Sequence, residues 1–483
     1  MKLNQKGLSF ASILKEIKQL KELDFDYTKG RLFSLVYYLG EKYSKFLNDA
    51  FYLFFSANGL NPGAFRSLKA LERNIISITA DLFHADENAC GVVTSGGTES
   101  CLLAVKTYRD YARKVKRIKS PEMIVADTAH VAWFKGAEYF NVKIHIVPSL
   151  PKGGADVAAI KKKINRNTIL ILGSAPEYPH GIIDPIVELG KIAEKKNIPL
   201  HVDACVGGFL LPFIERLGRP LPLWDFRVSA VTSISADIHK YGFAAKGAST
   251  IIYRSQEHFE HQLFVYEDWP GGIFASPALL GTRPGGSYSA AYAALRHHGI
   301  NGYTKLAEQA LAATDALQKG IRALDLSIMG EPQATLFAYR SKDPAINIFV
   351  VGDLMEKRGW HIDRIQKPDA LHAMVTPGHL PVVKEYLRDL KASIQEAKAN
   401  PQLAKEGAAA TYGMIAHAPF RRMVKDEVRK MFADTYRIAG GDLNLTENDF
   451  SATDTERKLS LKDRLIHWII ERQQAKERTK YNE

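Results

Sequence analysis

Short apolar runs alternate with longer, helix-like stretches between about residues 89 and 255. The runs are rich in β-branched residues, and in chain order they are CGVVT, MIVAD, KIHIVP, TILILG, IPLHVD, SAVTSIS and STIIYR. This alternation predicts crossover units and a mostly parallel seven-stranded sheet with helices on both faces. The predicted fold class is therefore α/β.

The pattern divides the chain into three predicted parts. Residues 1–60 form a helical arm, residues 61–300 contain the large sheet domain, and residues 301–483 form a smaller α+β domain. Five apolar side chains share one face of the helix in the arm, namely Phe10, Ile13, Leu14, Ile17 and Leu20. This face can pack against the protein, against a second subunit or on a membrane surface.

The C-terminal part is predicted to contain short strands at ATLFAYR and INIFVVG. Its last stretch, LSLKDRLIHWIIERQQAKERTK, predicts a capping helix. The apolar face of that helix is formed by Leu461, Leu465, Trp468 and Ile469.

Composition narrows the classes of partner. The 483 residues are 46% apolar and carry a net charge of +12, so the surface attracts anions such as phosphorylated molecules or acidic membranes. Nucleic acid is not an expected partner, because no arginine-rich tract, helix-turn-helix or zinc-finger spacing is present. The three cysteines form no CxxC pair, which argues against both a disulfide framework and a thiolate zinc site, so no metal is expected. Without a signal peptide or an apolar run of about 18 residues, we expect a soluble cytoplasmic protein.

The residues that follow the strands carry the candidate chemistry, because ligands of parallel sheets bind at the carboxyl ends of the strands. The first strand is followed by SGGTES, in which Gly97 and Thr98 begin a helix whose free N–H groups can hold a phosphate. The dinucleotide fingerprint GxGxxG and the Walker GK[ST] motif are absent. A phosphate that belongs to neither NAD nor ATP is therefore expected.

An acid and a lysine end two later strands. Asp203 needs a positive partner such as a pyridinium nitrogen, unless backbone amides satisfy it. Lys240 is either a residue at the edge of the sheet that prevents aggregation or a partly buried amine. Burial would lower the pKa of such an amine and suit it to form a Schiff base. His239 can hold a phosphate oxygen and His130 can stack on a ring, although each alone is more often a structural histidine. Together these residues predict a pyridoxal phosphate site.

The motifs VTSGGTES, HVDACVGGF, VTSISADIHKYGFAAKG and GTRPGG resemble those of the group II decarboxylase superfamily. Within that superfamily they are most similar to the sphingosine-1-phosphate lyase family, over about residues 30 to 435. The resemblance implies the fold-type-I pyridoxal phosphate-dependent transferase fold and a homodimer with shared active sites. It also implies that Lys240 forms the Schiff base, Asp203 pairs with the pyridinium and His130 stacks on the ring.

Further roles are implied by the same resemblance. The remaining cofactor-binding residues would be Gly97, Thr98, Ser174, His201, His239 and, from a neighbouring subunit, Thr282. The substrate-binding residues would be Tyr37, Asn58, Asn61, Cys205, Lys246 and Tyr412. Asn61 stands where the family has a histidine, and its uncharged amide is expected to change head-group affinity or its pH dependence.

The resemblance implies retro-aldol cleavage of a phosphorylated sphingoid base between C2 and C3. Lys246 and a phosphate oxygen are both candidates for the base that removes the C3 hydroxyl proton. Two alternatives stay open. One is an amino-acid decarboxylase that uses Lys246 for a substrate carboxylate; the other is a non-catalytic protein that binds membrane surfaces through its basic charge and its N-terminal helix.

Overall fold

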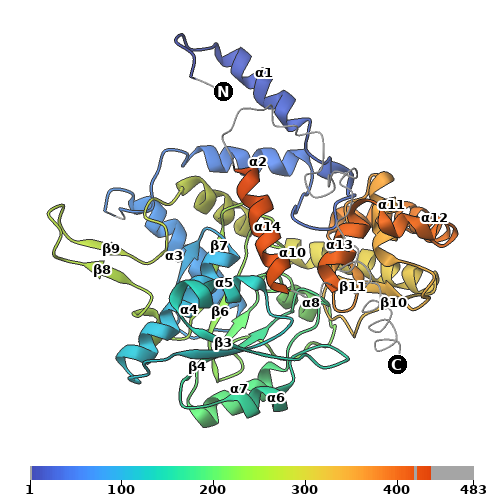
Figure 1. Cartoon of the computed structure of the whole chain (residues 1–483). Helices are drawn as coiled ribbons and strands as arrows, with labels where there is room; N and C mark the ends of the chain where they lie inside the picture. Colours follow the sequence, from blue (N-terminus) through green and yellow to red (C-terminus); the bar gives the residue numbers. More distant parts are fainter. Residues whose placement is uncertain (1–2, 62, 418–420, 437–483) are drawn as a thin grey trace.

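A seven-stranded sheet forms the centre of the larger part of the protein (Figure 1). The computed structural model describes residues 3–61, 63–417 and 421–436. The strands are β1 (Cys90–Thr94), β2 (Glu122–Ala126), β3 (Lys143–Val147), β4 (Thr168–Ser174), β5 (Leu200–Asp203), β6 (Val231–Ala236) and β7 (Ser249–Tyr253). They lie in the order β1–β7–β6–β5–β4–β2–β3, and β7 runs antiparallel to both neighbours. The seven predicted strands and the α/β fold class are confirmed.

Both faces of the sheet are covered, because consecutive side chains of a strand point in opposite directions. Val92 enters the core beneath α4 (Gly97–Lys114) and α5 (Val131–Phe140), whereas Val93 enters the core on the other face. That second core includes side chains from α3 (Arg66–Leu82), α6 (Val157–Lys163), α7 (Ile186–Lys196) and α8 (Leu211–Arg216). A strand buried on both faces has no polar alternation, which explains the continuous apolar runs of the sequence.

A four-stranded antiparallel sheet forms the smaller C-terminal part, in the order β10 (Leu326–Ile328), β11 (Leu336–Ser341), β13 (Ala370–Met374), β12 (Asp363–Ile365). The strand predicted at INIFVVG is wrong, because this run begins helix α11 (Ile348–Lys357). The side chain of Asn347 caps the helix by accepting hydrogen bonds from the N–H groups of Phe349 (3.0 Å) and Val350 (3.4 Å). A short, mostly apolar run has no periodicity that separates strand from helix.

Two segments project from the body of the protein (Figure 1). Helix α1 (Phe10–Lys21) buries none of its residues, so its apolar face does not pack against the rest of the chain. The hairpin of β8 (Phe264–Tyr266) and β9 (Phe274–Ser276) also extends outward. The predicted capping helix with Leu461, Leu465, Trp468 and Ile469 lies outside the described residues. In the described ranges, no helix combines the length and apolarity needed to cross a membrane.

Candidate active site

A cavity of about 430 Å³ opens beyond the carboxyl ends of β1, β4, β5 and β6. Its size is in the range of small-molecule sites. The predicted site residues that line it are Gly97, Thr98, His130, Ser174, Asp203, Cys205, His239 and Lys240. These residues are separated by up to 143 positions in the sequence, and the parallel strands bring them to one edge of the sheet.

Asp203 ends β5 and is 6% exposed. Its Oδ2 accepts a hydrogen bond from Nε1 of Trp133 (2.8 Å), and its Oδ1 accepts one from the backbone N–H of Cys205 (3.1 Å). Burial by itself would raise the pKa of Asp203, but the His130 imidazole and the donated hydrogen bonds outweigh burial and lower it. The group is therefore a buried carboxylate that stays ionised and favours a cation in the cavity.

Lys240 lies in the connection between β6 and β7, and its Nζ is 3.0 Å from Oδ2 of Asp237. The lowered pKa predicted for Lys240 is wrong in this structure. Burial does favour the neutral amine, but the charge and hydrogen bond of Asp237 outweigh burial and raise the pKa. Lys240 is therefore a protonated amine held by a neighbouring carboxylate.

The start of α4 and the ring of His239 form a candidate phosphate cradle. The N–H groups of the first helical turn have no acceptor within the helix, and Gly97 and Thr98 lie in that turn. The backbone N–H of Ala248 donates to Nδ1 of His239 (3.2 Å), so the ring proton of the neutral imidazole is on Nε2. Burial lowers the pKa of His239 and keeps it neutral. Nε2–H is thus available as a donor.

Gly97 allows the close packing of this cradle. A Cβ atom at this position would lie 2.8 Å from both carboxylate oxygens of Asp237 and 2.9 Å from Sγ of Cys205. No larger residue fits without moving buried groups. On another wall, His130 caps α5 by accepting a hydrogen bond from the N–H of Ala132 (3.2 Å), which fixes the ring at the cavity.

The sequence matches a known family over most of its length. Residues 4–342 match the pyridoxal-dependent decarboxylase conserved domain. The chain is 42% identical to the sphingosine-1-phosphate lyase of Oryza sativa over 87% of this chain and 79% of that protein. It is 40% identical to sphingosine-1-phosphate lyase 1 of Rattus norvegicus, over 89% and 76% of the two chains. The chain belongs to the sphingosine-1-phosphate lyase family.

Solved structures agree with this family assignment. The sphingosine-1-phosphate lyase of Burkholderia pseudomallei superposes with a TM-score of 0.79 at 36% identity, covering 84% of this chain and 94% of that one. The glutamate decarboxylase of Lactobacillus brevis has a TM-score of 0.72 at 22% identity, covering 82% and 95%. The second likeness shows a shared fold alone. The fold-type-I architecture and the family's use of pyridoxal phosphate are thus established for this chain.

Other predicted residues of the family site lie near the cavity without lining it. His201 is fully buried, with Nδ1 2.7 Å from Oγ of Ser233 and Nε2 3.1 Å from Oγ of Ser235. Burial lowers its pKa to about 4. Ser235 in turn lies 3.4 Å from Sγ of Cys205. His201 therefore belongs to a neutral hydrogen-bonded layer behind the cavity wall.

Lys246 and Tyr37 lie together within one chain. Nζ of Lys246 donates to the carbonyl of Leu35 (2.7 Å) and sits 5.1 Å from the centre of the Tyr37 ring. Burial lowers the pKa of Lys246 to about 8, and the positive charge of Lys240 contributes to the lowering. The N-terminal arm thus supplies the backbone and the aromatic face that position this second lysine.

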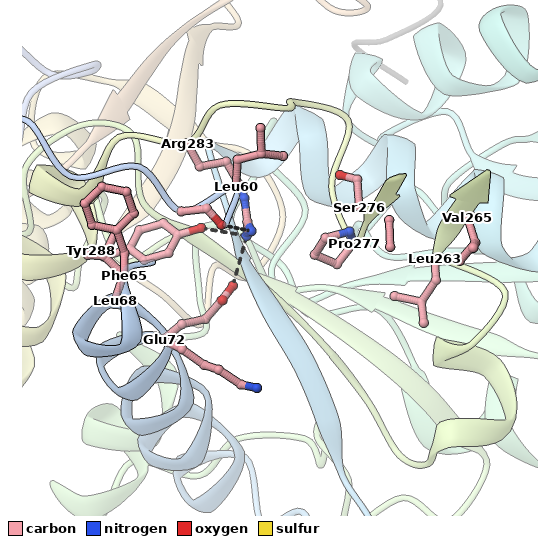
Figure 2. Close-up of a pocket in the computed structure, with 13 residues that line it drawn as sticks. Leu60, Phe65, Leu68, Glu72, Leu263, Val265, Ser276, Pro277, Arg283 and Tyr288 are labelled. Carbon is pink, nitrogen blue, oxygen red and sulfur yellow. Dashed lines mark hydrogen bonds and ion pairs between the residues drawn. The ribbon is translucent and has the colours of Figure 1, made fainter. Parts of the chain in front are cut away.

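Asn58 and Thr282 form a unit of their own, with Nδ2 of Asn58 3.2 Å from Oγ1 of Thr282. The backbone N–H of the neighbouring Arg283 donates to Oδ1 of Asn58 (3.3 Å). Figure 2 shows that the Arg283 side chain lines a second cavity of about 300 Å³, where its guanidinium reaches Glu72 (3.4 Å) and the Tyr288 hydroxyl (3.0 Å). Neither residue of the unit lines the Lys240 cavity formed by the described part of the chain.

The structure does not bring Asn61 and Tyr412 to the Lys240 cavity either. Oδ1 of Asn61 accepts hydrogen bonds from the N–H groups of Gly63 (3.0 Å) and Ala64 (3.2 Å), which makes it a turn residue here. Tyr412 lines a different cavity of about 830 Å³, where its ring lies 5.3 Å from the guanidinium of Arg364. Within a single chain these two positions are separate from the cofactor cavity.

Among the residues that the sequence reasoning missed, four carry contacts of interest at the cavity. Asp237 pairs with Lys240, Trp133 donates to Asp203, and Cys101 and Tyr178 line the cavity. Only Asp237 had a signal in the sequence, because it follows β6 directly and precedes Lys240 by three residues. The others become recognisable only when the helices are placed over the sheet.

Proposed function

We propose that this chain cleaves the C2–C3 bond of a phosphorylated sphingoid base, such as sphingosine 1-phosphate, with pyridoxal phosphate as cofactor. The products are a long-chain aldehyde and phosphoethanolamine. One observation carries the proposal: an ionised buried acid, Asp203, and the amine of Lys240 face the same cavity at the start of α4. Membership of the lyase family supplies the reaction class.

The residues at the cavity fit the cofactor. Oδ1 of Asp237 is buried and has no hydrogen-bond partner among the described residues, so the wall has unused capacity for a polar ligand. Asp203 would hold the ring nitrogen and Lys240 the aldehyde carbon. The remaining contacts would come from Gly97, Thr98, His130, Ser174 and His239. When bound, the cofactor supplies an electron sink for the pair released by carbon–carbon cleavage.

The chain's own residues bind the substrate and move its protons. The ionised carboxylate of Asp203 keeps a proton on the cofactor ring nitrogen. The cationic form of Lys246, with Tyr37 beside it, orients the phosphate head group and so the C2–C3 bond. Because its pKa is about 8, Lys246 is also present as a neutral amine near neutral pH and is a candidate to accept the C3 hydroxyl proton, as is a phosphate oxygen. C2 gains a proton, so the reaction needs no oxidant.

We also propose a homodimer whose partner subunit completes each site. The hairpin and its flanking loop expose eight large apolar side chains: Leu263, Phe264, Val265, Tyr266, Trp269, Ile273, Leu279 and Leu280. This exposure supports an interface. The Asn58–Thr282 unit lies beside this surface and would reach the partner's cavity, together with Asn61 and Tyr412. Residues 1–60 would wrap the partner, and residues 301–483 would form the small domain. Three unpaired cysteines suit a reducing compartment such as the cytoplasm.

The dimer can be tested by mixing inactive chains. Lys240→Ala and Asn58→Ala chains, each inactive alone, are co-expressed. If sites are shared, random assortment restores about a quarter of the wild-type activity, because half of the dimers contain one intact site. Absence of any recovery in purified mixed dimers contradicts shared sites.

The reaction is tested with a purified phosphorylated sphingoid base. The chain should release equal amounts of phosphoethanolamine and fatty aldehyde, and Lys240→Ala should abolish both, whereas Lys161→Ala on the exposed face of α6 should abolish neither. Release of carbon dioxide from glutamate or tyrosine instead would support the decarboxylase alternative. Salt-sensitive liposome binding without cofactor uptake would support the membrane-binding alternative and the exposed α1 as its contact.

A further inference from the structure

Two thiols that are far apart in the sequence meet at the wall of the cofactor cavity. Cys101 lies on α4 and Cys205 follows β5, and both are buried. Their sulfur atoms and a carboxylate oxygen of Asp203 all lie within 4.8 Å of one another. All three side chains line the same cavity. The fold thus assembles a donor set that sequence spacing does not contain.

The separation of Cys101 and Asp203 suits a tetrahedral thiolate metal site, and Cys205 lies within reach of the same ion. With metal–sulfur bonds of about 2.3 Å and metal–oxygen bonds of about 2.0–2.2 Å, neighbouring ligand atoms lie about 3.6–3.8 Å apart. Sγ of Cys101 is 3.8 Å from Oδ2 of Asp203. The cavity on the open side gives a metal ion an entry path and leaves a fourth coordination position.

A fourth polar group points to a cationic ligand. The side chain of Asp237 is 2% exposed, and its Oδ1 has no hydrogen-bond partner among the described residues. The position of a Cβ atom on Gly97 lies 2.8 Å from both Asp237 oxygens and 2.9 Å from Sγ of Cys205, so these groups surround one small space. Burial, and then the carboxylates of Asp203 and Asp237, raise the pKa of the Cys101 thiol to about 11, whereas its hydrogen bond with Cys205 and the charge of Lys240 oppose the rise. The two carboxylates give this corner negative charge, which the protonated amine of Lys240, 3.0 Å from Oδ2 of Asp237, partly offsets.

We propose that Cys101, Cys205 and Asp203 bind a thiolate-preferring divalent metal such as Zn²⁺ when pyridoxal phosphate is absent. Asp237 or water fills the fourth position. Binding breaks two S–H bonds, forms two metal–sulfur bonds and releases two protons to solvent without any change of oxidation state. The cofactor's ring nitrogen and the metal compete for Asp203, so each excludes the other. The competition, unlike the metal site itself, rests on the proposed function.

Cobalt provides a direct test, because its thiolate complexes absorb in the near ultraviolet. Titration of the full chain, freed of cofactor, with Co²⁺ should give a sulfur-to-metal band that saturates at one equivalent, with two protons released per metal. Cys101→Ser and Cys205→Ser should each lose the band. Cys90→Ser, at a half-buried cysteine on β1, should keep it. The absence of a band, or a band unchanged in Cys101→Ser, overturns the proposal.

A second measurement avoids folding effects of the variants. In the unmodified chain, zinc should slow alkylation of Cys101 and Cys205, but not of Cys90, when each peptide is followed by mass spectrometry. If zinc leaves the alkylation rate of each of the three cysteines unchanged, the metal site is contradicted. Added pyridoxal phosphate should then abolish the cobalt band. If the cofactor binds and the band persists, competition is wrong; if the cofactor fails to bind at all, the proposed function fails while the metal site stands.

Discussion

Replacing Asp237 by asparagine tests the charge balance around Lys240. Oδ2 of Asp237 lies 3.0 Å from Nζ of Lys240, the carboxylate side chain is 2% exposed and the lysine side chain is 24% exposed. With an effective dielectric constant of about 20, two unit charges at this distance attract by about 5 kcal/mol. That energy corresponds to more than a thousandfold in proton affinity. Because the lysine is partly exposed, solvent screens part of this attraction.

The variant should therefore make Lys240 far more reactive near neutral pH. Without the carboxylate, burial is the largest remaining influence and favours the neutral amine, while Cys205 and Asp203 still favour the charged form, so the pKa of Lys240 falls from its raised value. We expect acetylation of Lys240 at pH 7, in chain free of cofactor, to become at least about a hundredfold faster, since only the neutral amine reacts. Competitive labelling followed by mass spectrometry measures this rate for each lysine peptide.

A matched control uses an exposed lysine–aspartate ion pair with a similar distance between nitrogen and oxygen. Nζ of Lys398 is 2.8 Å from Oδ2 of Asp343, and both side chains are largely exposed. Asp343→Asn should leave the labelling rate of Lys398 nearly unchanged, because water screens such pairs. If Asp237→Asn alters Lys240 labelling by less than threefold, Asp237 does not hold the lysine in its charged form.

Three further predictions concern the same cavity. Gly97→Ala should abolish measurable binding of pyridoxal phosphate while circular dichroism stays that of the parent, because the new methyl group would lie 2.8 Å from the Asp237 oxygens; normal cofactor titration would contradict this. Inhibition by phosphoethanolamine should weaken as pH rises through about 8, where Lys246 loses its charge, and Lys246→Arg should remove that dependence; an unchanged profile in the arginine variant would exclude Lys246 as the titrating group. Asp203→Asn should lower turnover at least about a hundredfold, because the ring nitrogen loses its ionised partner, while the cofactor absorbance of bound enzyme persists; near-normal turnover would refute the role of the acid.

The sequence was most informative where burial leaves a visible pattern. Most strands of the large sheet are covered on both faces and read as apolar runs, and the run of the edge strand β3, whose residues are mostly exposed or half-buried, was predictable too. Parallel strands also fix which edge carries the loops, and this placed Asp203 and Lys240 at one cavity. The same reasoning failed at INIFVVG, where hydrophobicity alone does not separate a strand from a capped helix.

Properties that depend on the packing of several helices and strands could not be predicted from the sequence. The pKa of Lys240 is set by Asp237, whose orientation follows from the turn and not from composition. The contact of Cys101 with Cys205 and Asp203 requires α4 to be docked on the sheet. The division of the chain at residues 60 and 300 stays a prediction. The roles of Asn58, Thr282 and Tyr412 also stay predictions, because their proposed partners belong to a second subunit.

The antiparallel strand β7 has a mechanical consequence for Lys240. A parallel strand would have led into a crossover helix, but here the chain returns at once, and the connection is closed where His239 N–H donates to Ala248 O (3.1 Å) and Phe243 N–H donates to Lys240 O (2.9 Å). These two loop hydrogen bonds hold the backbone on either side of the lysine, so its motion is mainly that of its flexible four-carbon side chain. If Lys240 holds the cofactor as proposed, its amine would leave and return to the same anchor point in each turnover.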